Sequence, residues 1–397
     1  MTSKALITES DVRRAIQDGS LTIRVSGEPI ITPLAASSIT EQGIRIIQEG
    51  SLSSTDASNS SIGTSGTSCP DAELNLQGRD PSFLLNIYAM MWRVRMFEEA
   101  MGILFREKHL VGFLHLSIGQ EAVSTGTCAA LKADDYLTLT HRGHGQMVAR
   151  GSDVKKMAAE LLGKATGYCK GKGGSVHLAD FQNGILGANG IIGASLVIAA
   201  GAAMSAKIRK TNQVAIAFFG DGATNQGAFH EALNYSSIQK LPVIFVCENN
   251  QYAVSTSCSQ ASACTSFASR GAAYGMSAMQ IDGMNVLEVY DTVKSAVNQA
   301  RQGGGPTFIE CITYRTRGHW EGETTDLRPS AEKELWNKRD AIQRLKRALI
   351  TSQMADEHKL DEIYNNVVHE IAEAVRFAEQ SPYPDPQEAL RNVMANG

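Results

Sequence analysis

The sequence predicts an α/β protein with a doubly wound, mostly parallel sheet, a helical C-terminal arm and a small N-terminal α+β module. Two apolar runs, Val214 to Phe219 and Val243 to Cys247, have the continuous hydrophobicity of buried parallel strands. The segment between them, Ala223 to Ile238, has helical character. Open sheets of this class bind ligands at the carboxyl ends of their strands, so the residues after each run are the first candidates for a site.

The first 50 residues are predicted to form a small separate module. We expect two helices, one around Asp11 to Asp18 and one opened by Pro33, and two strands, Leu21 to Val25 and Ile44 to Ile47. Residues 51–79 are expected to be a linker, because Ser, Thr, Gly and Asn dominate residues 51–68. The role of the module is open, either docking to a partner or a passive extension. The remaining residues, 80–397, are predicted to form one domain.

That domain is expected to begin with a long helix, capped by Asp80 and opened by Pro81. The segment Gly112 to Ala122, GFLHLSIGQEA, follows this helix and carries His115. A single histidine beside a helix is more often structural than catalytic. His115 is therefore only a candidate from its position alone.

The segment THRGHG, Thr140 to Gly145, follows an expected strand, Tyr136 to Leu139. Arg142 in this position can bind a phosphate through two parallel hydrogen bonds. His144 could equally be a histidine packed within the loop.

Gly171 to Gly201 is rich in glycine, which indicates backbone lying close to something flat or charged, or helices packed through small residues. The stretch lacks the Walker spacing, and it lacks the GxGxxG pattern of dinucleotide-binding folds.

The triplet Gly220-Asp221-Gly222 follows the first apolar run, and Asn249-Asn250 follows the second. The glycines allow a phosphate and its metal close to the backbone, and a helix N-terminus beside them favours an anion. One carboxylate, one amide oxygen and backbone carbonyls suit Mg²⁺ held beside a diphosphate, whereas zinc prefers His or Cys. The pattern therefore predicts a metal–diphosphate site.

The phrase GDGATNQGAFHEALNYSSIQKLPVIFVCENNQYAVST resembles the thiamine diphosphate motif of the alpha subunits of 2-oxo acid and acetoin dehydrogenase complexes. The resemblance implies the diphosphate-binding type of the thiamine-diphosphate fold. It implies Asp221, the side chain of Asn250 and the main-chain oxygen of Tyr252 as Mg²⁺ ligands. The cofactor-binding residues that it implies are Arg142, His141, Gly190, Ile192, Gly220, Asp221, Gly222, Ala223, Asn250 and His319. Many relatives carry tyrosine in place of His141, so the role of His141 is open.

A strand, Phe308 to Tyr314, is expected to lead into the loop RTRGHWEGE, residues 315–323. The corresponding loop of 2-oxo acid dehydrogenases commonly reads HGHS, with a serine that eukaryotic relatives phosphorylate. Arg317 and Trp320 replace the first histidine and the serine, so we do not expect that regulation here. The loop looks more like the acetoin-cleaving branch, and the resemblance implies His319 and His115 as catalytic residues.

These observations predict oxidative cleavage of acetoin to acetaldehyde and an acetyl group, which passes to lipoamide or an artificial acceptor. A pyruvate or branched-chain 2-oxo acid dehydrogenase is the alternative, and a cofactor-free scaffold is the non-enzyme alternative. After residue 329 only a helical arm, 330–380, and a Pro-rich tail are expected, so nothing supplies the glutamate that activates the cofactor. The family takes it from a beta subunit, which implies an alpha2-beta2 heterotetramer serving a lipoyl-bearing transacetylase.

Composition excludes several classes of protein. The net charge of −4 without a basic block argues against nucleic acid as a partner. No apolar run reaches the length of a membrane span, and the N-terminus does not resemble a secretory signal. Seven cysteines without a CxxC pair indicate reduced thiols and a cytoplasmic location.

Overall fold

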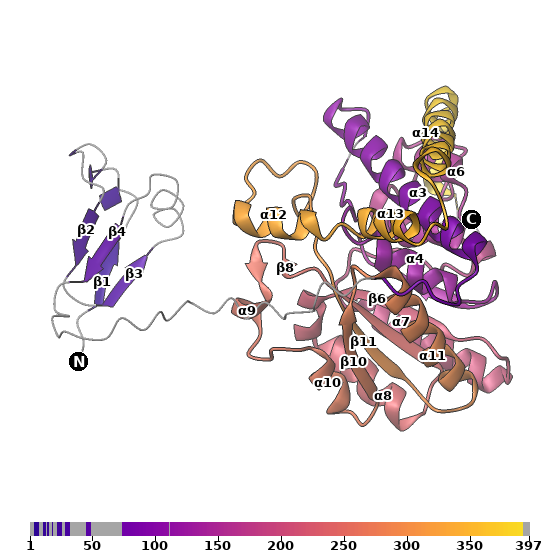
Figure 1. The fold of residues 1–397 in the computed structure, drawn as a ribbon, viewed down its shortest axis with the longest axis horizontal. Coiled ribbons are helices and arrows are strands. Elements are labelled where there is room, and N and C mark those ends of the chain that lie inside the picture. Colours follow the sequence, from indigo (N-terminus) through magenta and orange to yellow (C-terminus); the bar gives the residue numbers. More distant parts are fainter. Residues whose placement is uncertain are drawn as a thin grey trace. The chain divides into compact units, whose positions relative to one another are not determined.

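The computed structural model describes residues 74–110 and 112–391, together with 4–7, 11–12, 14–15, 18, 22–25, 28–31 and 45–48. The chain divides into two compact units, residues 1–66 and 67–397, each of which is described by itself (Figure 1). Most of the predicted linker lies outside the described residues. The division into 1–50, 51–79 and 80–397 therefore stays a prediction.

The N-terminal unit contains two pairs of parallel strands. Strand β1 (Lys4–Ile7) pairs with β3 (Glu28–Ile31), and β2 (Thr22–Val25) pairs with β4 (Arg45–Gln48). Strands β2 and β4 match the two predicted strands to within one residue, whereas β1 and β3 were not predicted. The described residues of the first predicted helix are helical, except for the turn at residue 18. The helix predicted to open at Pro33 lies outside the described residues.

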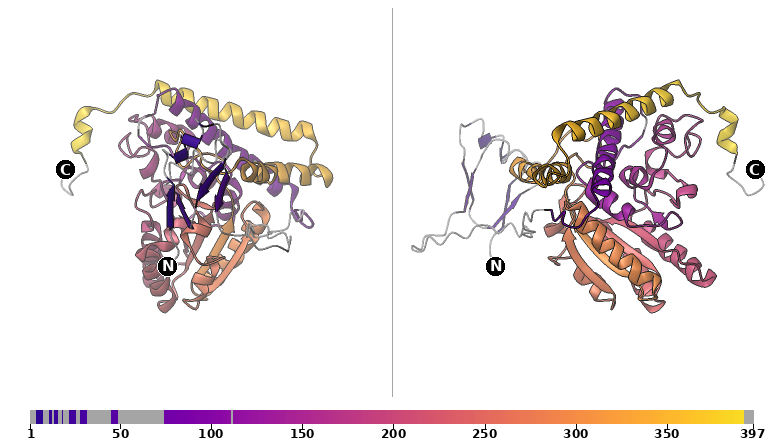
Figure 2. Two further views of the ribbon diagram at one scale, coloured as in Figure 1. Left: turned by 90° about the vertical axis from the view of Figure 1, so that its left-hand side faces the viewer. Right: turned by 45° about the vertical axis from the view of Figure 1, so that its right-hand side comes forward.

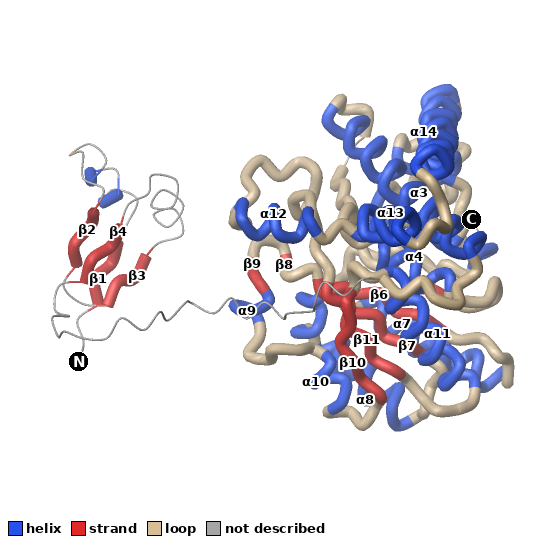
Figure 3. Tube along the Cα trace, in the orientation of Figure 1, coloured by secondary structure: helices blue, strands red, loops and turns tan. Residues whose placement is uncertain are grey.

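The second unit is built on a five-stranded parallel sheet, which confirms the predicted fold class (Figure 3). Its order is β10 (Ser277–Asp282), β11 (Thr307–Ile312), β7 (Val243–Asn249), β6 (Ala215–Gly220) and β5 (Tyr136–Thr138). Strand β7 runs two residues further than its apolar run, because Glu248 pairs with Gly220 and Asn249 pairs with Ile312. Glu248 and Asn249 are therefore held by strand pairing at the carboxyl end of the sheet.

Helices cover both faces of this sheet, as alternating side chains of β6 demonstrate. Ile216 and Phe218 join a core with helices α3 (Pro81–Arg106), α4 (Glu121–Ala129), α6 (Val154–Leu161), α11 (Val286–Arg301) and α14 (Glu357–Gln380). Ala217 and Phe219 join a second core with α7 (Ala194–Arg209) and α8 (Gly227–Ile238). The remaining short elements are α5 (His144–Arg150), β8 (Tyr252–Ala253), β9 (Thr256–Ser257), α9 (Cys258–Ala261), α10 (Ala268–Ala272) and the 3₁₀ turns Ser175–His177, Phe181–Asn183, Asp221–Asn225 and Pro386–Leu390.

The helical arm is confirmed as α12 (Ser330–Lys338), α13 (Ala341–Thr351) and α14. Helix α3 begins as predicted, because the Asp80 side chain accepts the N–H of Ser82. Helix α14 packs on α3 and α6 (Figure 2). Among the described residues, no helix is both long and apolar enough to cross a membrane.

One helix, α8, begins later in the chain than predicted. Residues 221–225 form a 3₁₀ turn, and α8 begins only at Gly227, not at Ala223. The Thr224 hydroxyl donates to the main-chain oxygen of Asp221 at 2.6 Å, which closes this tighter turn. The N-terminus of α8 is therefore separated from Asp221 by the turn.

Candidate active site

A cavity of about 250 Å³ lies at the carboxyl ends of β6 and β7, where the sequence predicted a site. Its wall includes most of the predicted residues, namely His141, Arg142, Ile192, Gly220, Asp221, Gly222, Ala223, Asn250, Tyr252 and His319. Gly190 is next to the lining residue Asn189 and has no atom within 4 Å of the place where a Cβ would stand. His115 is not part of the lining but packs against two histidines that are.

Oxygen ligands gather at one end of the cavity. The Asp221 carboxylate is buried, which raises its pKa to about 6, and it accepts the Cys258 thiol at 3.3 Å. The Asn250 amide nitrogen donates to Gln120 Oε1 at 2.9 Å, and Asn250 Oδ1 accepts a hydrogen bond from the main-chain N–H of Tyr252 at 3.3 Å. This end of the cavity can hold a hard cation.

The segment after Asn250 has positive φ angles at Gln251 (75°) and Val254 (56°), and it reverses between the antiparallel strands β8 and β9. Ala253 of this segment lies against Gly222, where a Cβ on the glycine would lie 2.6 Å from the Ala253 Cβ. Gly222 is therefore required by this close packing and not only by a phosphate. The space in front of Gly220 is open, because no atom lies within 4 Å of its Cβ position.

Two buried arginines face the cavity. Arg142 donates to the main-chain oxygens of Leu116 at 2.5 Å and His319 at 2.9 Å, and Arg315 donates to that of Val254 at 3.1 Å. Within the part of the chain that the structure describes, neither guanidinium lies within ion-pair distance of a carboxylate. Burial lowers the pKa of Arg142 to about 9 and that of Arg315 to about 10. A buried positive charge without an ion-pair partner is costly, so this arrangement favours an anion in the cavity.

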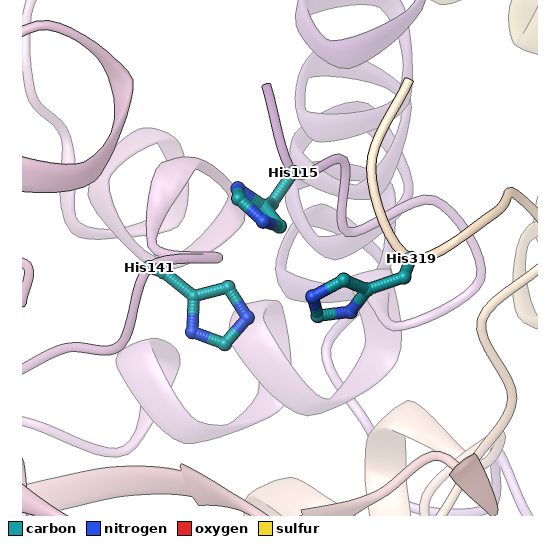
Figure 4. A group of neighbouring side chains, drawn as sticks. All are labelled: His115, His141 and His319. Atoms are coloured by element: carbon teal, nitrogen blue, oxygen red, sulfur yellow. The ribbon is translucent and has the colours of Figure 1, made fainter. Parts of the chain in front are cut away.

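The rings of His115, His141 and His319 surround one space, as Figure 4 shows. Ring centroids are 4.7 Å apart for His115 and His141, 5.0 Å for His115 and His319, and 5.7 Å for His141 and His319. Burial and the charge of Arg142 lower their pKa values to about 2, 3 and 4, respectively, so all three rings are neutral at pH 7. Nδ1 of His115 and Nδ1 of His141 are buried and have no hydrogen-bond partner among the described residues.

Comparison with known proteins identifies the chain. Residues 88–387 match the dehydrogenase E1 component family. The chain belongs to this family. It is 47% identical over 308 residues to the alpha subunit of acetoin:2,6-dichlorophenolindophenol oxidoreductase of Bacillus subtilis, covering 77% of this chain and 92% of that protein. Thiamine diphosphate is the cofactor of the family, and the E1 chain is accordingly a thiamine-diphosphate-dependent oxidoreductase.

Other relatives of this E1 chain differ in the substrate that their names give. The acetoin oxidoreductase alpha subunit of Cupriavidus necator is 39% identical over 315 residues, covering 79% of this chain and 95% of that protein. The chloroplastic pyruvate dehydrogenase E1 alpha-3 subunit of Arabidopsis thaliana is 40% identical over 318 residues, covering 79% and 74%. Identity alone therefore does not separate an acetoin enzyme from a pyruvate enzyme.

The E1 chain uses several of its buried polar residues for scaffolding. His144 is fully buried between Glu98 Oε2 and Ser175 Oγ, each at 3.0 Å, so it is a packed loop histidine outside the cavity. The Glu160 carboxylate accepts main-chain N–H groups from Cys169, Gly171, Gly173 and Gly174. The first glycines of the Gly-rich stretch thus surround the Glu160 carboxylate. Only the later part of the stretch, around Ile192, reaches the cavity.

Gln120, Glu248 and Arg315 are among the polar residues of the cavity wall to which the sequence assigns no role. Arg315 was noted only as the start of the loop, and Gln120 only as part of GFLHLSIGQEA. Glu248 accepts Gln146 Nε2 at 2.9 Å, and burial raises the pKa of its carboxyl to about 7. A polar residue directly after a buried strand was the available signal for Glu248 and Arg315, because the ends of neighbouring parallel strands meet at one edge.

Proposed function

We propose that this E1 chain is the alpha subunit of an acetoin-cleaving dehydrogenase and binds thiamine diphosphate with Mg²⁺ in the cavity described above. The observation that carries the proposal is the pair of buried arginines without carboxylate partners, Arg142 and Arg315, in the same wall as Asp221. A diphosphate supplies the missing negative charge, and a divalent cation beside it explains why a buried carboxylate is tolerated.

The residues present fit the cofactor. Asp221, Asn250 Oδ1 and the main-chain oxygen of Tyr252 would hold Mg²⁺, and Arg142 would bind the diphosphate. Open space before Gly190 and Gly220 leaves room for the cofactor against the main chain, with Ile192 and Ala223 beside it. When bound, thiamine diphosphate supplies a carbon nucleophile and an electron sink for breaking a bond next to a carbonyl. His319 and His115 would hold and move protons at the substrate end.

Acetoin is proposed as the substrate because of the loop that carries His319 and the names of two similar relatives. Contacts with α3 and the segment after it hold this loop in place. Arg317 forms an ion pair with Glu99 at 2.6 Å, and the Trp320 ring lies 5.1 Å from Phe113. Arg317 and Trp320, which replace the first histidine and the serine of HGHS, therefore both contribute contacts that hold the loop in place. A pyruvate or branched-chain 2-oxo acid substrate is the second candidate, favoured by the similarity to plant pyruvate dehydrogenase.

The partner proposal follows from the relatives, which are named as alpha subunits. A beta subunit would supply the glutamate that activates the cofactor, in an alpha2-beta2 heterotetramer. A lipoyl-bearing transacetylase would accept the acetyl group.

The test is turnover by the chain coexpressed with a beta subunit of the same kind of enzyme. Thiamine diphosphate, Mg²⁺ and dichlorophenolindophenol would be supplied, and acetoin compared with pyruvate and branched-chain 2-oxo acids. Reduction of the dye with acetoin, and release of acetaldehyde, are expected. Activity with a 2-oxo acid while acetoin stays inert would retain the cofactor proposal and overturn the substrate.

A further inference from the structure

We propose that Glu310, acting through Asn249, positions the ligands of the metal site and sets its preference for Mg²⁺ over a larger cation. This inference rests on the proposed function, because it concerns the proposed ligands Asp221, Asn250 and Tyr252. It gives a task to two buried polar residues that stand behind the wall of the cavity.

The Glu310 carboxylate is fully buried on β11, the strand that pairs with β7. Its Oε1 accepts a hydrogen bond from Asn249 Nδ2 at 2.7 Å. Its Oε2 accepts hydrogen bonds from Ser266 Oγ at 2.6 Å and from the main-chain N–H of Ala268 at 3.1 Å. These neutral donors satisfy the buried carboxylate. Because a carboxylate with such partners only accepts, the Asn249 amide must turn its nitrogen toward Glu310.

The Oδ1 of Asn249 is thereby turned toward the metal-binding segment. It accepts hydrogen bonds from the main-chain N–H of Gln251 at 3.2 Å and from Gln251 Nε2 at 3.1 Å. Gln251 stands between the proposed ligands Asn250 and Tyr252 and has a φ of 75°. The left-handed region is unfavourable for a residue with a Cβ, so these hydrogen bonds stabilise a backbone conformation that the segment would otherwise leave. The spacing of the two ligands therefore depends on Asn249.

The same amide oxygen is also linked to the third proposed ligand. Cys258 Sγ lies 3.1 Å from Asn249 Oδ1 and 3.3 Å from Asp221 Oδ2. One atom thus connects to Asp221 through the thiol and to the 250–252 segment through Gln251. If Glu310 no longer fixed the Asn249 amide, both connections would loosen together.

Loosened ligands should affect two divalent cations unequally. Mg²⁺ demands near-ideal octahedral geometry at about 2.0–2.1 Å, whereas Ca²⁺ accepts irregular coordination at about 2.3–2.6 Å. Residues that orient the ligands of a metal commonly contribute about 10–100-fold to its affinity. Loss of this support should therefore cost more Mg²⁺ affinity than Ca²⁺ affinity.

Calorimetry of the chain in complex with a beta subunit, with thiamine diphosphate present, measures Mg²⁺ and Ca²⁺ binding without relying on turnover. Glu310→Gln should weaken Mg²⁺ binding by about 10–100-fold and Ca²⁺ binding by less. The loss of one negative charge alone would weaken both cations alike, and that result would overturn the proposal. Ser266→Ala is the matched control, because it removes a donor to Oε2 and leaves the contact with Asn249. It should keep the Mg²⁺ affinity of the wild type, and an equal loss would assign the effect to residues 266–268 instead.

Two further variants test the pair itself. Asn249→Ala changes no charge and should reproduce the loss of Mg²⁺ affinity, so it decides the question if the buried substitution Glu310→Gln prevents folding. Asn249→Asp alone sets two carboxylates against each other and should also weaken Mg²⁺ binding. The double variant Asn249→Asp/Glu310→Gln exchanges donor and acceptor at unchanged net charge, and most of the Mg²⁺ affinity should return. A double variant as weak as the single ones would contradict the pairing.

Failure of the proposed function gives a different result. If Asp221→Asn keeps the Mg²⁺ affinity of the wild type, the metal site is wrong, and this inference is wrong with it. If Asp221→Asn loses Mg²⁺ while Glu310→Gln and Asn249→Ala bind it as the wild type does, only this inference is wrong.

Discussion

Replacing Asp221 with asparagine should stabilise the cofactor-free protein while removing its metal site. The carboxyl is buried, and burial raises its pKa to about 6 from an ordinary value near 3.8. The folded state therefore binds this proton more tightly than the unfolded state does. Stability is lost as pH rises from about 4 to about 6, and the loss is complete above the folded pKa.

The size of the effect follows from the same two values. Their difference corresponds to about 3 kcal/mol at 1.36 kcal/mol per pH unit. Because asparagine stays neutral, Asp221→Asn should recover up to about 3 kcal/mol at pH 7.5 and about half of that at pH 5. For a unit of this size, 3 kcal/mol raises Tm by roughly 4 °C.

Thermal unfolding of the metal-free chain at pH 7.5 and pH 5 measures this directly. Asp180→Asn is the matched control. Asp180 is also buried, but its carboxylate accepts hydrogen bonds from the side chains of Ser152 and Asn183, and its pKa is lowered. That variant should lose stability at pH 7.5. A lower Tm for Asp221→Asn at pH 7.5, or a gain that is independent of pH, would refute the reasoning.

Three further results are expected. Adding Mg²⁺ and thiamine diphosphate should raise the Tm of the wild type by mass action and leave that of Asp221→Asn unchanged, as measured in the same scans. Gly222→Ala should cost about 1–3 kcal/mol and weaken cofactor binding, because the new methyl group meets Ala253; denaturant unfolding and calorimetry measure the two effects, and wild-type stability would contradict the packing. Arg142→Met should lower thiamine diphosphate affinity at least tenfold, because it removes the buried positive charge proposed to bind the diphosphate, as calorimetry measures; an unchanged affinity would place the diphosphate elsewhere.

The sequence predicted the parts of the fold that depend on local pattern. Strands β6 and β7 were found because both faces of each are buried, which makes their apolar runs continuous. Strand β10 was missed because it lies at the edge of the sheet and reads SAMQID, with polar residues and partial exposure. The start of α8 was misplaced because a tight turn at Asp221 has the same composition as a first helical turn.

The residues of the cavity wall were predicted where a motif names them, and their contacts were missed where the partners come from distant segments. His141 and His144 are three residues apart, yet His141 lines the cavity, and His144 binds Glu98 behind it. Nothing local distinguishes the two histidines. The contact of Arg315 with His319 depends on the path of the loop, and the lack of an ion pair to Arg315 among the described residues depends on the whole tertiary structure. Spacing in one sequence does not carry such information.

A crystal structure of the chain with its beta subunit, thiamine diphosphate and Mg²⁺ tests the central claim most directly. The metal is expected about 2.1 Å from oxygens of Asp221, Asn250 and Tyr252. The diphosphate should contact Arg142, and the reactive end of the cofactor should face His319. A metal bound by the three histidines, or a diphosphate outside this cavity, would contradict it.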